Sequence, residues 1–277
     1  MNPHHAHPTS PAAMLRSLIV NRQLIGQLIR RDVVGRYRGS LMGIAWSFLN
    51  PLLMLVIYTV VFSGIFKSRW PGMGTDSTTG FAVVLFVGLI VHGLFAECVT
   101  RAPGLVLANP NYVKRVIFPL EILPWVSMGS ALFHSLISFC VLIVAQVVVN
   151  GTLPWTVVFV PVVVAPLILT TLGIAWFLSA LGVFVRDISQ ITTVIVSVAM
   201  FLSPVFYPLS TIKTPRFQRL LYLNPLTYPI EDARGALIFG RVPSPLHLLV
   251  ALVAGLVVAQ VGFWWFQKAR RGFADVI

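Results

Sequence analysis

Long apolar runs separated by short polar stretches dominate the chain. The longest stretches without a charged residue cover 39–66, 77–96, 122–185, 188–212 and 242–267. A helix needs about 20 apolar residues to cross roughly 30 Å of hydrocarbon. Four of these runs therefore predict one membrane crossing each, and the longest run predicts two.

The longest run divides at 150–154, where Asn-Gly-Thr-Leu-Pro is typical of a tight turn. The runs are continuously apolar rather than alternating, which favours helices over a membrane β-barrel. We therefore predict an all-α integral membrane protein whose transmembrane domain, residues 44–266, contains six spans. The predicted spans are 44–66, 81–100, 126–149, 157–184, 188–207 and 246–266.

Composition and charge agree with a membrane protein. Of the 277 residues, 57% are hydrophobic and 10% are charged, against roughly 25% charged in soluble domains. The net charge of +12 does not indicate nucleic-acid binding, because no soluble module is present to form a basic face. Thirteen of the 20 Lys and Arg residues lie on the side that carries both termini, so the positive-inside rule predicts cytoplasmic termini. Five positive charges in 208–245 oppose this orientation.

The N-terminal region precedes the first span. Residues 1–13 are rich in Pro and His and predict a disordered cytoplasmic tail. Apolar and basic residues then alternate at helical spacing over 14–34, within the segment 14–43 that leads to span one, and this predicts an amphipathic helix in the cytoplasmic interface. Its apolar stripe suits either lipid or a soluble partner. Four arginines of the region are assigned to lipid headgroups: Arg30, Arg31, Arg36 and Arg38.

Glycines and a proline shape the beginning of span one. Gly35, Gly39 and Gly43 recur every four residues. This spacing suits either close helix approach in lipid or a bend of the chain into the bilayer, and we favour the bend. Pro51 lies inside the span and predicts a kink.

The cytoplasmic connection at 101–125 is longer than a simple link requires. Asn109 before Pro110 is a favourable helix start, and it predicts a short docking helix near 110–117. This helix would expose Tyr112, Lys114 and Arg115.

The connection at 208–245 is rich in both proline and apolar residues. Irregular backbone at membrane depth is tolerated only where it packs in protein or lines a cavity. We therefore predict two short re-entrant helices, near 215–223 and 226–239. Near the outer mouth, local ion pairing and substrate contact are both open roles for Glu231, Asp232 and Arg234.

Ionisable residues inside spans are costly and often functional. Three occur here: His92, Glu97 and His134. An i,i+4 pair with Arg101 is the favoured role for Glu97, and His134 has no evident partner in the sequence. The chain lacks a G-x-x-x-x-G-K-[ST] loop, so it is expected to bind no ATP itself, and it shows no metal-ligand cluster. Catalysis by this chain is not expected.

Three segments carry a resemblance to a known family. They are RYRGSLMGIAWSFLNPLLMLVIYTVVFSGIFK (36–67), NPNYVKRVIFPLEILP (109–124) and the stretch 202–240, which holds LSPVFYPLSTI and LYLNPLTYPIEDARGALIFG. Together they resemble the membrane subunit of type-2 ABC exporters for cell-envelope polysaccharide. The O-antigen permeases are the nearest group, followed by capsule and teichoic acid permeases.

This resemblance implies a half-transporter in the bacterial inner membrane. Two copies of the chain would form the pore, and two copies of a separate ATPase would bind ATP and Mg beneath it, with no cofactor in this chain. By resemblance, 109–118 is the coupling helix and 213–240 holds two periplasmic gate helices, while 267–277 is a cytoplasmic tail. The implied substrate is a polysaccharide on a polyprenyl diphosphate carrier, whose diphosphate the four interface arginines could also attract. The alternative is a type-2 exporter of a drug or small lipid.

Such a substrate suggests an aromatic channel, since sugar rings stack on aromatic faces through weak, repeated contacts. Spans one and five supply suitable side chains, although packing against lipid or in the headgroup belt is the competing interpretation. The candidates are Trp46, Phe48, Tyr58, Phe62, Phe201, Phe206 and Tyr207.

Overall fold

The computed structural model describes residues 8–65, 70, 78–114 and 118–276. These residues form helices and turns, with no strand among them. The predicted all-α class is confirmed. Short helices occupy the connections, and their bounds are α1 Pro11–Val20, α2 Arg22–Arg36, α5 Pro110–Lys114, α9 Pro215–Tyr222, α10 Thr227–Leu237 and α12 Phe273–Val276.

Five helical stretches of the described chain are long and apolar enough to cross a membrane. They are Gly43–Phe62, Gly80–Gly104, Leu120–Asn150, Trp155–Phe184 and Pro245–Val276. Each has one α-helix as its main part, extended by shorter turns. These helices are α3 Trp46–Tyr58, α4 Thr78–Arg101, α6 Leu123–Asn150, α7 Val160–Phe184 and α11 Pro245–Ala269.

The predicted fifth span, 188–207, is not confirmed as a spanning helix. Helix α8 covers Ile188–Phe201, and its 14 residues give a length of about 21 Å at 1.5 Å per residue, short of the roughly 30 Å of hydrocarbon. Pro204 ends the helix because it has no N–H to donate and disfavours helical backbone before it. The chain unwinds through 202–208.

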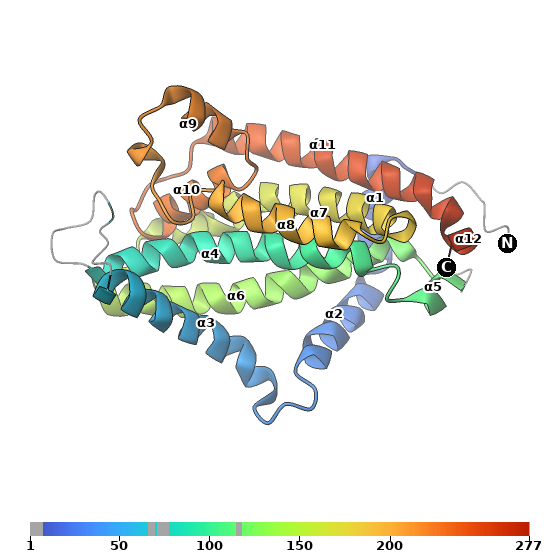
Figure 1. Ribbon diagram of the computed structural model, residues 1–277, viewed down its shortest axis with the longest axis horizontal. Coiled ribbons are helices and arrows are strands. Elements are labelled where there is room, and N and C mark those ends of the chain that lie inside the picture. The colour runs from blue at the N-terminus through green and yellow to red at the C-terminus, as the bar shows by residue number, and fades with distance from the viewer. Residues whose placement is uncertain (1–7, 66–69, 71–77, 115–117, 277) are drawn as a thin grey trace.

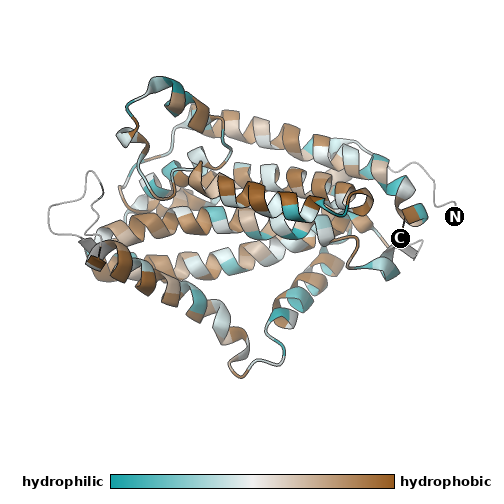
Figure 2. Ribbon diagram, in the orientation of Figure 1, coloured by the Kyte–Doolittle hydropathy of each residue, from teal (hydrophilic) through white to brown (hydrophobic). Residues whose placement is uncertain are grey.

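Helices α3, α4, α6, α7, α8 and α11 nevertheless run side by side and alternate in direction (Figure 1). Helix α4 lies inside this bundle and has the most buried surface of the long helices. Helices α1, α5 and α12 lie toward one end, and α9 and α10 lie at the other (Figure 1). Apolar residues follow the long helices, whereas hydrophilic residues gather on α2 and around α5 (Figure 2).

The N-terminal region differs from the single helix predicted for 14–34. Helix α1 begins at Pro11, inside the predicted tail, and Ser10 caps it by accepting from the Ala13 N–H at 3.2 Å. Asn21 separates α1 from α2, because its side chain donates to the Ser17 carbonyl at 2.8 Å and closes the first helix. In α2, Ile25 and Leu28 are buried against the chain's own bundle. The bundle itself therefore covers part of the apolar stripe that was expected to face lipid or a soluble partner.

The bend before span one is confirmed. Gly39 and Gly43 have φ values of 86° and 53°, which side chains with a Cβ rarely adopt. A Cβ at Gly35, Gly39 or Gly43 would meet nothing within 4 Å, so these glycines do not mediate close helix approach. The predicted turn after α6 is also present, and Gly151 has a left-handed φ of 68° there.

Helices α7 and α11 have the most extensive contact of any helix pair in the described chain. Their backbones touch at glycines, since a Cβ at Gly173 would collide with the Val258 carbonyl and one at Gly262 would collide with Gly173. Small residues allow helices to approach this closely in lipid, where packing replaces the hydrophobic effect. Trp176 of α7 and Phe263 of α11 add an edge-to-face contact at 5.2 Å between ring centroids.

The variant Gly262→Ala tests this packing. We expect it to destabilise the protein by about 1–3 kcal/mol, the usual cost of overpacking, because the added methyl overlaps backbone atoms that cannot yield. The measurement is the thermal unfolding midpoint in detergent. Gly26→Ala in α2 is the control, since its Cβ meets nothing; a midpoint for Gly262→Ala equal to that of the control would disprove the close contact.

Candidate functional site

Four of the predicted channel aromatics converge at the end of the bundle that carries α9 and α10. Phe62 is the centre of the group. Its ring centroid lies 6.4 Å from that of Tyr58 and 6.5 Å from that of Phe206. Phe206 in turn stacks on Phe201 at 5.7 Å. Phe62 lies on Thr59–Ile65, which continues α3 as a π-helix, a geometry frequent at functional sites.

Sequence reasoning missed two members of this aromatic cluster. Phe81, at the beginning of α4, stacks on Phe62 at 5.6 Å, and Trp70 contacts Phe81 at 5.6 Å. Both side chains are buried. Tyr207 bonds the unwound segment back to α8, because its hydroxyl donates to the Phe201 carbonyl at 3.1 Å.

Two other predicted channel aromatics lie apart from the cluster. Trp46 and Phe48 are in the first turn of α3, near the opposite end of that helix. Phe48 is half exposed, as expected for a side chain on the lipid-facing or partner-facing surface.

Arg234 of α10 holds the unwound segment 202–208 in place. Its guanidinium is buried and donates to the carbonyls of Pro204 and Val205, the latter at 2.6 Å. It also donates to the Val84 carbonyl of α4 at 3.0 Å. The bonds to Pro204 and Val205 pair carbonyls of the unwound segment, as a membrane interior requires.

The same side chain is paired and stacked. Glu231 accepts from Arg234 at 3.0 Å, and the guanidinium lies over the Trp70 ring at 4.5 Å from its centroid. Burial lowers the pKa of Arg234 to about 10, so the group stays charged at neutral pH. Ion pairing, one of the two roles open for this residue, is therefore present, and Arg234 positions the aromatic cluster through its bonds beside Phe206.

The other predicted gate carboxyls differ in surroundings. Burial raises the pKa of Glu231, although the Arg234 charge opposes this. Burial also raises the pKa of Asp232, which His247 partly offsets. Both side chains are half buried, so the structure leaves either carboxylate partly accessible.

A second charged group joins α2, α4 and α6. Arg36 donates to Glu97 at 2.5 Å, and Nδ1 of His134 lies 3.0 Å from the same carboxylate oxygen. Nδ1 also lies 3.3 Å from Arg36. One nitrogen cannot both donate and accept, and the shorter distance favours donation to Glu97. His134 thus has a partner, 37 positions away in the sequence. This group lines a cavity of about 340 Å³ whose wall also includes Tyr58.

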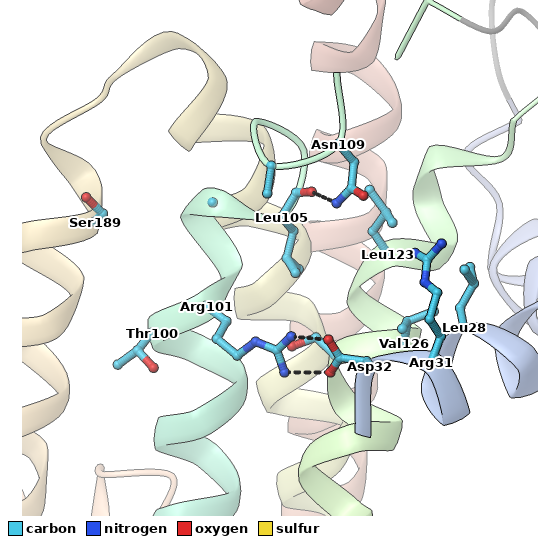
Figure 3. A pocket seen from close by; sticks show the side chains of 13 residues that line it. Leu28, Arg31, Asp32, Thr100, Arg101, Leu105, Asn109, Leu123, Val126 and Ser189 are labelled. Carbon is cyan, nitrogen blue, oxygen red and sulfur yellow. Dashed lines mark hydrogen bonds and ion pairs between the residues drawn. The ribbon is translucent and has the colours of Figure 1, made fainter. Parts of the chain in front are cut away.

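Arg101 forms the predicted i,i+4 ion pair with Glu97, but Asp32 is its main partner. It lies 3.9 Å from Glu97 but donates two bonds to Asp32 of α2, at 2.9 and 2.7 Å. Burial raises the pKa of Asp32, but the bonds and charge of Arg101 outweigh this and hold it below its usual value. The pair lies at a cavity of about 500 Å³ that Arg31 and Asn109 also line (Figure 3).

The helix predicted near 110–117 is observed over Pro110–Lys114, as α5. The Asn109 side chain donates to the Leu105 carbonyl at 2.9 Å and so closes the preceding turn. Tyr112 stacks on Phe118, with ring centroids 4.0 Å apart. Lys114 is the last residue of α5, and Arg115 lies outside the described residues. Of the predicted interface arginines, Arg30, Arg31 and Arg38 are exposed, which suits contact with lipid headgroups.

Comparison with known proteins identifies the family. The model of the ABC-2 type transporter family matches residues 23–238, which contain the aromatic cluster, α5 and α10. The chain belongs to this family. As an ABC-2 transporter subunit with several long apolar helices, it is a multi-pass membrane protein.

Three relatives match this ABC-2 chain over almost their whole length. An O-antigen export system permease protein RfbA of Myxococcus xanthus is 28% identical over 95% of this chain and 99% of its own. A protein of the same name from Klebsiella pneumoniae is 25% identical over 92% of this chain and 95% of its own. The capsule polysaccharide export inner-membrane protein CtrC of Neisseria meningitidis serogroup B is 21% identical over 92% and 94%.

The variant Arg234→Met tests the positioning role. It leaves the carbonyls of Pro204 and Val205 in the unwound segment without the Arg234 donor, and each buried unpaired group costs about 1–3 kcal/mol. We expect a clearly lower unfolding midpoint in detergent, with Arg234→Lys intermediate because it restores charge but fewer donors. Arg216→Met in α9 is the control, since Arg216 is exposed. Equal midpoints for Arg234→Met and Arg216→Met would refute the role.

Proposed function

We propose that this chain is the membrane subunit of an ATP-driven exporter of cell-envelope polysaccharide. The substrate is a polysaccharide linked to a polyprenyl diphosphate, moved from the cytoplasmic to the periplasmic side of the inner membrane. The near full-length similarity to O-antigen export permeases carries this proposal. The capsule export relative is named for a substrate of the same class, a polysaccharide.

The proposed topology has six crossings and cytoplasmic termini. Helix α8 and the unwound segment 202–208 together would make the crossing that α8 alone is too short to complete. The alternating course of the six helices supports this, as does the position of α1 and α12 at one end (Figure 1). Arg234 was one of five charges that opposed this orientation, and its burial removes it from the surface charge of the outer side.

The proposed complex contains two copies of this chain and two copies of an ATPase. The absence of a P-loop motif in the sequence agrees with a separate nucleotide-binding subunit that holds ATP and Mg. Helix α5 would dock on that subunit as the coupling helix. Helices α9 and α10 would be the periplasmic gate helices, and the exposed arginines of α2 would face lipid headgroups or the carrier diphosphate.

The aromatic cluster suits a sliding sugar polymer. Stacking contacts are individually worth about 0.5–1.5 kcal/mol, which is enough to guide a chain and too little to trap it. Tyr58 and Glu97 both line the same cavity, and Phe62 lies between Tyr58 and Phe206 in the aromatic cluster.

Replacing Tyr58, Phe62 and Phe206 together with Ala tests the channel. We expect export of carrier-linked polysaccharide to fall about tenfold, because the loss of even one such contact is worth up to about 1.5 kcal/mol. Export is measured as polysaccharide uptake into inverted vesicles with ATP added outside, and copurification with the ATPase reports assembly. The matched control replaces Trp46 and Phe48, which lie outside the cluster. Normal export by the assembled triple variant would contradict the aromatic pathway.

Coupling is tested at α5. Replacing Tyr112 and Arg115 with Ala should either weaken binding of the ATPase or separate ATP hydrolysis from export, because Tyr112 holds α5 against Phe118. The readouts are the yield of the complex and the polysaccharide exported per ATP hydrolysed. Retention of both at the level of the unmodified complex would rule out this role for α5.

The substrate class is tested by stimulation of ATP hydrolysis. Carrier-linked polysaccharide should raise the ATPase rate of the reconstituted complex, whereas small amphiphiles should not. The reverse pattern would favour a drug or small-lipid exporter and refute the proposal.

A further inference from the structure

The segment that follows α5 is clamped by the last membrane helix. Arg270, in the turn after α11, donates to the Glu121 carboxylate at 2.5 Å and to the Phe118 carbonyl at 2.9 Å. The side chains of Arg270 and Glu121 are only 12% and 15% exposed. Solvent therefore screens this ion pair little, and each partner depends on the other for its hydrogen bonds.

Helix α7 holds the same connection at two further points. The indole of Trp176, fully buried in α7, donates to the Glu121 carbonyl at 3.0 Å. On the other side of α5, the backbone at Pro103 lies so close to Gly182 of α7 that a Cβ there would collide with it. Both ends of the connection that carries α5 thus rest on α7.

Helices α7 and α11 are in turn one packing unit. Their backbones meet at Gly173 and Gly262, and Trp176 packs on Phe263. Close-packed helices of this kind move together rather than deform. A displacement of α5 would therefore reach α11 as well as α4 and α6, to which α5 is linked through the chain.

We propose that Arg270 is a positioning residue that makes the α7–α11 pair follow α5. This inference rests on the proposed role of α5 as the coupling helix. Movement of the ATPase would pass through α5 to the segment 118–122, through the Arg270 clamp to α11, and so to the whole length of the pair. Helix α5 is joined covalently to α4 and α6 through the chain. The clamp adds a noncovalent connection to α11, which is remote from α5 in the sequence.

The first experiment separates coupling from assembly. In the reconstituted complex, we expect Arg270→Ala to keep the ATPase rate and subunit yield but to lower polysaccharide exported per ATP about tenfold, equivalent to roughly 1.4 kcal/mol. This is near the lower value for a hydrogen bond to a charged group. Arg270→Lys and Glu121→Gln each keep part of the clamp and should give intermediate losses. Arg271→Ala, at an exposed neighbouring position, should resemble the unmodified complex.

A distance measurement reports the motion itself. Spin labels at Asn111→Cys in α5 and Ala274→Cys in α12, both exposed, are introduced with Cys140→Ser because Cys140 is also exposed. In the unmodified clamp, the distance between the labels should keep its mean and width on ATP trapping. In Arg270→Lys, it should shift or broaden. A distance that stays constant in both proteins would overturn the inference.

The outcomes also separate this inference from the function on which it rests. If Tyr112→Ala lowers export per ATP and the Arg270 and Glu121 variants do not, α5 couples but the clamp does not transmit, and the inference fails alone. If Tyr112→Ala leaves assembly and export unchanged, the coupling role of α5 fails and the inference fails with it. If Arg270→Ala fails to assemble, export per ATP in Arg270→Lys and the distance between the spin labels decide whether the inference holds.

Discussion

A charged group within a membrane bundle must find its partners inside the protein, because lipid offers none. The arginines of this chain that reach into the bundle satisfy this constraint by bonding to other helices. Arg234 reaches carbonyls of α4 and of the segment after α8, and Arg270 reaches the segment after α5. Apolar packing alone gives helices in lipid little reason to prefer one neighbour. The polar bonds supply that preference, and they hold the functional segments at fixed positions.

The two ends of the bundle are built differently. At the end with α9 and α10, one buried guanidinium lies beside an aromatic cluster, which the proposed function assigns to contact with the polymer. At the other end, charged pairs such as Arg101 with Asp32 surround a cavity beside α5. The closely packed α7–α11 pair extends between these ends (Figure 1). In the proposed function, a polymer exporter requires weak, repeated contacts at one end of the bundle. It also requires a rigid connection to the other end, which would face the ATPase.

Much of the fold could be predicted from local sequence. The apolar runs located the long helices, the Asn-Gly turn at 150–154 located a hairpin, and the spaced glycines located the bend that Gly39 and Gly43 make. Local signals failed where a polar or proline residue altered a helix. Asn21 divides the N-terminal helix, and Pro204 stops α8 before it can span the membrane. Hydropathy averages over such positions and therefore does not register them.

The aromatic cluster was predicted in part. Aromatic content identified Tyr58, Phe62, Phe201 and Phe206, but nothing in the sequence separated these from Trp46 and Phe48 or added Phe81 and Trp70.

The sequence alone determined that this is a helical membrane protein, where its long helices lie, and which residue types are available for contact with sugar or ATPase. Those properties follow from hydropathy and turn chemistry, which are local. Only the tertiary structure decided that Arg101 pairs with Asp32 rather than chiefly with Glu97, that His134 has a partner, and that Arg270 reaches Glu121 after α5. These contacts join residues up to 149 positions apart, and their formation depends on how whole helices pack.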